Sequence, residues 1–120
     1  EKFDGPSLII AYSHCINHGI NMRLGLSQQK KAVESGHWPL FRYNPDKIEQ
    51  GENPLTIDSK DPSIPMAEYA YGENRYKMLL KSDEARAEML MKEAQLGSER
   101  RWKLYKQLAD LNYEMGKKSE

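Results

Sequence analysis

The residues that could do chemistry gather near the N-terminus, where the single cysteine, Cys15, stands between His14 and His18. A thiolate can act as a nucleophile or bind zinc or an iron–sulfur cluster, and an imidazole can act as a base or a metal ligand. A cysteine can also be a small buried residue with no chemical role. The residues around Cys15 and elsewhere in the chain indicate how well each of these roles fits.

Each alternative makes a different demand on the rest of the chain. A zinc site would draw on His14, Cys15, His18 and His37, but these residues lack the paired spacing of a zinc module. A cysteine nucleophile would need a base, for which His18 or His37 could serve, and nothing else resembles a protease or transferase motif. An iron–sulfur cluster needs four thiolates, so Cys15 could contribute only alongside cysteines from elsewhere.

The segment before Cys15 is expected to be a strand over residues 8–12. Its residues Leu-Ile-Ile-Ala are apolar without alternation, which is typical of a strand buried on both faces of a parallel sheet. Ligands in open α/β sheets bind at the carboxyl ends of strands, where Cys15 follows. Asn17 and Gly19 suit the turn after the strand. Because a strand so near residue 1 has no earlier strand to pair with, we expect the chain to be cut from a larger protein.

The rest of the chain is expected to alternate short elements and then become helical. Gly36 is placed to end the first helix, and Gly72 to break the helix after the turns. Ser82 is expected to cap a final amphipathic helix that is kinked or split at 97–98. The expected elements are a helix over 24–35, strands over 38–43 and 55–57 (a hairpin or two extended arms), turns over 58–65, a helix over 66–80 and a helix from 82 onward.

Composition excludes several classes of protein. The chain has 120 residues, 38% hydrophobic and 30% charged, so it can bury only a modest core. The formal net charge of zero gives no electrostatic footprint for nucleic acid or for an anionic membrane. No apolar run is long enough to span a bilayer. The lone cysteine cannot form an internal disulfide, which favours a cytoplasmic setting.

The order of the motifs resembles the C-terminal part of one known family, pyruvate:ferredoxin (flavodoxin) oxidoreductase. The first motif is Gly-Pro-Ser-Leu-Ile-Ile-Ala-Tyr-Ser-His-Cys-Ile-Asn-His-Gly-Ile at 5–20. The resemblance covers nearly the whole chain, in order and with compatible spacing. The further matching segments are Gln-Gln-Lys at 28–30, Ala-Val-Glu-Ser-Gly-His-Trp-Pro-Leu-Phe-Arg-Tyr-Asn-Pro at 32–45, Gly-Glu-Asn-Pro-Leu at 51–55, Asp-Ser-Lys at 58–60, Glu-Asn-Arg-Tyr at 73–76 and Arg-Trp-Lys-Leu-Tyr at 101–105.

The resemblance implies a parent enzyme and a fold class. Members of the family are large, oxygen-sensitive and usually homodimeric; they oxidatively decarboxylate pyruvate on thiamine diphosphate and Mg²⁺ to give CO2 and acetyl-CoA. Electrons leave through three [4Fe–4S] clusters to ferredoxin or flavodoxin. The chain would then be α/β, the end of the thiamine-diphosphate-binding domain. Residues 1–65 would be the C-terminal part of that domain, with a parallel-sheet strand and short extended segments, and 66–120 its helical C-terminal region.

The resemblance also assigns a role to Cys15, as the fourth iron ligand of the [4Fe–4S] cluster nearest the thiamine. The other three cysteines and the Gly-Asp-Gly motif for diphosphate and magnesium would lie upstream, in the rest of the parent polypeptide. His14 and His18 would make contacts that tune the cluster. No residue of this chain is expected to be catalytic, and the isolated chain is expected to be inactive. The alternative is a stand-alone α/β interaction module with a structural cysteine.

Overall fold

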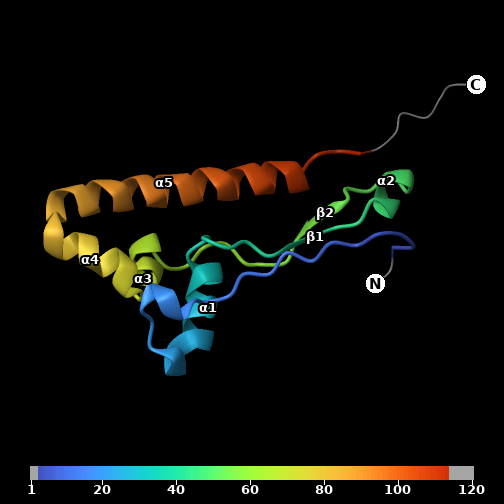
Figure 1. The fold of residues 1–120 in the computed structure, drawn as a ribbon. Helices are drawn as coiled ribbons and strands as arrows, with labels where there is room; N and C mark the ends of the chain where they lie inside the picture. Colours follow the sequence, from blue (N-terminus) through green and yellow to red (C-terminus); the bar gives the residue numbers. More distant parts are fainter. Residues whose placement is uncertain (1–2, 114–120) are drawn as a thin grey trace, which may run out of the picture.

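One long helix, α5 (Glu84–Ala109), runs along one side of the molecule. The protein is represented by a computed structural model, which describes residues 3–113. Helices α1, α3 and α4 lie toward one end, and the strands β1 and β2 with α2 lie toward the other (Figure 1). None of the helices in the described range has both the length and the hydropathy that a membrane crossing requires.

The first elements are two short 3-10 helices, η1 (Ile16–His18) and η2 (Met22–Leu24), followed by α1 (Gly25–Glu34). The helix predicted over 24–35 is confirmed. It ends at Ser35, and Gly36 then takes a left-handed conformation with φ of +70°. Ala32 on this helix is fully buried, whereas Leu26 is 82% exposed, so only part of the helix's apolar surface enters the core.

The two extended segments form a hairpin rather than separate arms. Strand β1 (Phe41–Tyr43) pairs antiparallel with β2 (Leu55–Ile57), with Phe41 opposite Ile57 and Tyr43 opposite Leu55. The short helix α2 (Asp46–Glu49) lies between the strands in sequence. The rings of Phe41 and Tyr105 are 5.3 Å apart, which attaches the hairpin to α5.

The helical half of the chain agrees with its prediction at one place and differs from it at two. The helix expected over 66–80 is two helices, α3 (Met66–Ala70) and α4 (Asn74–Ser82), with the break at Gly72 as expected. The cap of α5 is Asp83, whose carboxylate accepts from the backbone of Arg86, whereas Ser82 ends α4. The kink expected at 97–98 is wrong. Helix α5 continues through both residues, because α-helical geometry tolerates a single glycine at a modest cost.

The core joins residues from both halves of the chain. Its buried members are Ala32, Met66, Tyr69 and Ala70, and Tyr12 and Trp38 are among the side chains packed against them. Polar contacts add to this small core, because buried polar groups need partners. The Ser98 hydroxyl donates to the Ser35 carbonyl oxygen, and Trp102 Nε1 donates to Asp61. The predicted division of the domain into residues 1–65 and a helical region from residue 66 stays a prediction.

The strand predicted over 8–12 does not form in this chain. Leu8, Ile9 and Ile10 are 84%, 82% and 69% exposed, and these residues pair with no strand within 3–113. A strand is completed by a neighbour that takes its backbone hydrogen bonds, and in the described range the one sheet is the antiparallel β1–β2 pair. A parallel sheet around residues 8–12 therefore stays a prediction.

We expect Asn53 to stabilise the C-terminal end of α5. Its amide nitrogen donates to the carbonyl oxygens of Leu108 and Ala109, both at 2.8 Å, and its Oδ1 accepts from Leu55. Asn53→Ala should lower the free energy of unfolding, measured in urea, by about 1 kcal/mol. Asn53→Asp should lower the free energy of unfolding more than Asn53→Ala does at neutral pH, because it places a carboxylate at the negative end of a helix. Lys103→Ala on α5 is the control, and equal midpoints for Asn53→Ala and wild type would contradict the role.

Two glycine substitutions should change stability in opposite directions. Gly97 lies inside α5, and a Cβ added there would meet no atom within 4 Å, so Gly97→Ala should raise the free energy of unfolding by about 0.5–1 kcal/mol. At Gly36 the φ is +70° and a Cβ would lie 2.8 Å from Pro62 Cγ, so Gly36→Ala should lower the free energy of unfolding. Urea denaturation checks both signs, and destabilisation by Gly97→Ala would mean that α5 needs flexibility there.

Candidate functional site

Cys15 stands where the extended N-terminal segment turns into η1. Its backbone is extended, with φ of −127° and ψ of 130°, and the His18 amide donates to the Cys15 carbonyl oxygen at 3.1 Å. Gly19 closes the turn that the sequence predicted, and it does so in the left-handed conformation. The thiol is free and half-buried. Cys15 is therefore a thiol at the start of a tight turn, available as a ligand.

A buried carboxylate lies behind this turn. Glu73, in the break between α3 and α4, is fully buried, and its Oε2 lies 2.8 Å from His18 Nδ1. Its Oε1 accepts from Gln28 Nε2 at 3.3 Å and from the Tyr69 hydroxyl at 3.5 Å. Because a buried carboxylate is costly without such partners, the pairing with His18 is a strong constraint on where the turn can lie.

Arg75 decides which nitrogen of His18 carries the proton. Its Nη1 lies 3.2 Å from His18 Nε2, and a guanidinium can only donate. Nε2 must therefore accept, so the proton of the neutral ring is on Nδ1, where it is donated to Glu73. Arg75, His18 and Glu73 thus form a chain that connects a cation to a buried anion through an oriented imidazole.

A second contact ties the end of the turn to the same break. The Asn74 amide donates to the Gly19 carbonyl oxygen at 3.2 Å. A Cβ at Gly19 would lie only 2.8 Å from Asn74 Cβ, so the backbone of the turn sits close against this side chain. Three consecutive residues, 73–75, therefore hold the turn that begins at Cys15.

The segment before Cys15 is held through Tyr12. The Tyr12 hydroxyl is hydrogen-bonded to the Tyr69 hydroxyl, and Gln29 Nε2 donates to the Tyr12 carbonyl oxygen at 3.4 Å. The Tyr12 ring also lies 5.5 Å from the Trp38 ring. Burial raises the pKa of Tyr69 well above its usual range, and the bond to Tyr12 and the nearby Glu73 act in the same direction. Tyr69 is therefore a neutral hydrogen-bonding group.

The histidines proposed with Cys15 have different surroundings. His14 packs against Gly25, where a Cβ would lie 2.5 Å from its Nε2, and its buried Nδ1 has no hydrogen-bond partner within residues 3–113. His37 stacks on Tyr69 at 4.6 Å. Both nitrogens of His18 are already engaged by Glu73 and Arg75.

These surroundings test the zinc and nucleophile hypotheses. Within the described part of the chain, no group of three or more His, Cys, Asp or Glu residues could hold a metal ion. The zinc set of His14, Cys15, His18 and His37 is therefore not assembled here. His18 has no free nitrogen to act as a base for the thiol.

Sequence reasoning missed the residues that hold the turn. Gln28, Tyr69, Glu73 and Arg75 lie in segments that were expected to be ordinary helix, and a buried glutamate is rare. The available signals were the predicted break at Gly72, which places polar residues at a helix start, and the Glu-Asn-Arg-Tyr motif of the resemblance. Neither signal indicates that the partner of Glu73 is His18, 55 positions earlier.

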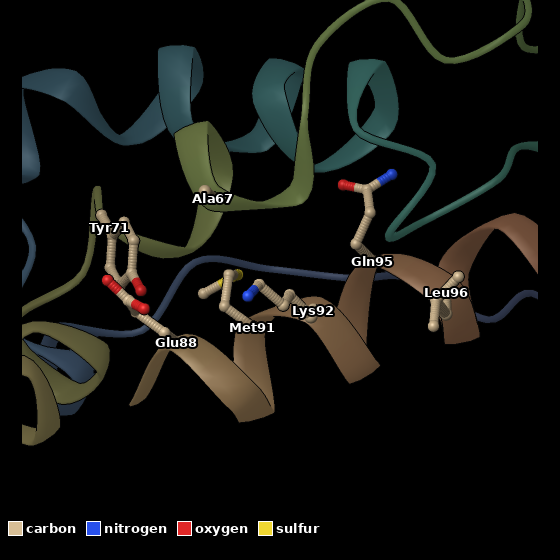
Figure 2. Close-up of a pocket in the computed structure, with 7 residues that line it drawn as sticks. All are labelled: Ala67, Tyr71, Glu88, Met91, Lys92, Gln95 and Leu96. Atoms are coloured by element: carbon tan, nitrogen blue, oxygen red, sulfur yellow. The ribbon is translucent and has the colours of Figure 1, made fainter. Parts of the chain in front are cut away.

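The structure also has an apolar groove between α3 and α5, with a volume of about 560 Å³. Figure 2 shows Ala67 and Tyr71 on one side and Met91 and Leu96 on α5 opposite. Its charged groups are Glu88 and Lys92, which both come from α5. The groove therefore offers apolar surface rather than a constellation of reactive groups.

Comparisons with known proteins show which proteins this chain is similar to. No protein-family model matches the chain. A pyruvate-flavodoxin oxidoreductase of Nostoc sp. is 54% identical over 109 residues, which are 91% of this chain and 9% of that protein. The chain is similar to one stretch of this enzyme.

Other relatives carry the same kind of name. The pyruvate:ferredoxin oxidoreductase of Moorella thermoacetica is 48% identical over 92% of this chain and 9% of that protein. The probable pyruvate-flavodoxin oxidoreductase of Escherichia coli is 37% identical over 91% of this chain and 9% of that protein. The chain thus spans about a tenth of the length of the curated relatives it matches.

The site analysis predicts that His37 makes stability depend on pH. Burial, and then the positive charge of Arg101, hold the pKa of His37 below its ordinary value of 6.5. Since the unfolded chain takes up this proton at a higher pH than the folded chain, stability should be full above pH 6.5 and fall below it.

His37→Phe keeps an aromatic ring on Tyr69 and removes the titration. The variant should lose part of the decrease in the free energy of unfolding between about pH 8 and about pH 5. Urea denaturation at several pH values measures this for both proteins. All other titratable groups are present in both proteins. Parallel plots of the free energy of unfolding against pH would therefore show that His37 does not contribute to the pH dependence of stability.

Proposed function

We propose that this chain is the part of a pyruvate-flavodoxin or pyruvate:ferredoxin oxidoreductase in which Cys15 binds iron of a [4Fe–4S] cluster. The observation that supports this most is the 54% identity over 91% of the chain to an enzyme of that name. In this proposal the parent enzyme decarboxylates pyruvate oxidatively and forms CO2 and acetyl-CoA.

The surroundings of Cys15 fit the role of one ligand among four. The thiol is free, only half-buried and at the start of a turn that other elements hold in place. A [4Fe–4S] cluster carries electrons and is bound by four thiolates, of which this chain has one. The other three would come from the rest of the parent polypeptide. Cys15 would bind iron rather than attack a substrate.

The exposed N-terminal segment supports the proposed position of the chain within the parent. Leu8, Ile9 and Ile10 are largely exposed here, although their pattern is that of a strand buried on both faces. We place them as a strand in the parallel sheet of the thiamine-diphosphate-binding α/β domain, next to strands of the parent. Cys15 would then lie at the carboxyl end of that strand, on the ligand side of the sheet.

The further components of the parent follow from the same proposal. Thiamine diphosphate and Mg²⁺ would be bound mainly by parts of the parent outside this chain, and coenzyme A would accept the acetyl group. Ferredoxin or flavodoxin would receive the electrons, as the names of the relatives state for those enzymes. The parent would be a cytoplasmic homodimer. The helical segment over 66–113 would support the Cys15 turn through α3 and α4.

The proposal is tested by Cys15→Ser in the full-length parent enzyme, purified without oxygen. The variant should lose about four iron atoms per chain and the reduced-state EPR signal of one cluster, or alter that signal, because serine is a poor replacement for a thiolate. Ser13→Ala, in the same segment, is the matched control and should keep both. Unchanged iron and an unchanged spectrum in Cys15→Ser would make Cys15 a packing residue and would refute its role as a cluster ligand.

A further inference from the structure

We propose that Glu73 is a positioning residue for Cys15, which acts through His18 on the turn from which the thiolate would bind iron. This inference rests on the proposed function, because it takes Cys15 to be a cluster ligand. It adds a buried carboxylate, from a helix break far away in sequence, to the residues that set the geometry of the cluster site.

The connection from Glu73 to Cys15 has two short steps. Glu73 Oε2 accepts from His18 Nδ1 at 2.8 Å, and the His18 backbone amide donates to the Cys15 carbonyl oxygen at 3.1 Å. Because η1 is a single 3-10 turn and this bond joins its two ends, the backbones of Cys15 and His18 are directly linked. A displacement of the His18 ring would therefore be passed on to Cys15.

Glu73 is itself held independently of the turn. Gln28 Nε2 bridges Glu73 Oε1 and the Tyr69 carbonyl oxygen, the latter at 2.9 Å. The Glu73 side chain is fully buried, so it cannot exchange these partners for water. It is thus a fixed point against which the orientation of His18 is set, and Arg75 on the opposite nitrogen completes that orientation.

A purely structural role for Glu73 would have different consequences. In that case Glu73 would only stabilise the junction of α3 and α4, and its loss would lower stability without changing the cluster. A positioning role would change the orientation of the ligand and the hydrogen bonds around it. These properties influence the spectrum and reduction potential of an iron–sulfur cluster. The cluster signal therefore separates the two roles.

The experiment compares four variants of the anaerobically purified full-length parent, and a control variant, with wild type. Glu73→Gln keeps an oxygen that can accept from His18 Nδ1, whereas Glu73→Ala removes it. His18→Asn places an amide nitrogen near the position of Nδ1, and His18→Gln places one near Nε2. Trp102→Phe is the control, because it removes a hydrogen bond of α5, from Trp102 Nε1 to Asp61, that involves none of the residues of the Glu73–His18 connection. Iron content, reduced-state EPR and the potential of the affected cluster are measured.

We expect Glu73→Ala to shift the g values and potential of the cluster that is lost in Cys15→Ser, with a partial loss of its iron. Glu73→Gln should shift them less, and His18→Asn should stay closer to wild type than His18→Gln. Trp102→Phe should match wild type. If Glu73→Ala does not fold, the order of the other three variants still decides the outcome.

Three results would overturn the inference, and they can be told apart. If Cys15→Ser loses a cluster while the Glu73 and His18 variants keep the wild-type signal and potential, the proposed function stands and the positioning role is wrong. If Cys15→Ser itself leaves iron and EPR unchanged, the proposed function fails and the positioning role fails with it. Equal shifts in Trp102→Phe would also overturn it, since they would reflect a general loss of stability.

Discussion

The structure around Cys15 depends on one buried carboxylate. Glu73 is fully buried in the break between α3 and α4, and the hydrogen bonds to His18, Gln28 and Tyr69 satisfy it. Burial of a charged group is tolerated only with such partners, so α1, the Cys15 turn and the α3–α4 junction must come together around it. The conformation of the Cys15 turn therefore follows from the hydrogen bonds that the buried Glu73 carboxylate requires.

The long helix α5 is attached by polar contacts distributed along its length. Gln95 Oε1 accepts from the Met66 amide at the start of α3, and Asn53 donates to the last carbonyl oxygens of α5. Arg101 donates to the His37 carbonyl oxygen. These contacts matter because the apolar fraction is low, and several apolar residues of α5 stay exposed.

Exposed apolar side chains occur along much of the described chain, and two apolar regions stand out. Leu8, Ile9 and Ile10 form one such region, and the groove between α3 and α5 forms another. Large exposed apolar patches on a protein commonly mark a surface that another segment or chain covers. This property accords with the proposal that most of the functional unit lies in a longer polypeptide.

Features that depend on residues a few positions apart could be predicted from the amino-acid sequence. Gly36 ends α1, Gly72 separates α3 from α4, and the strand at 55–57 lies where its residues predict it. The pairing of Glu73 with His18, and the lack of a partner strand for residues 8–12 within the described chain, became visible in the folded molecule alone. A cap or a turn is built from local backbone geometry, whereas a buried charge and a strand each need a partner that folding alone brings close.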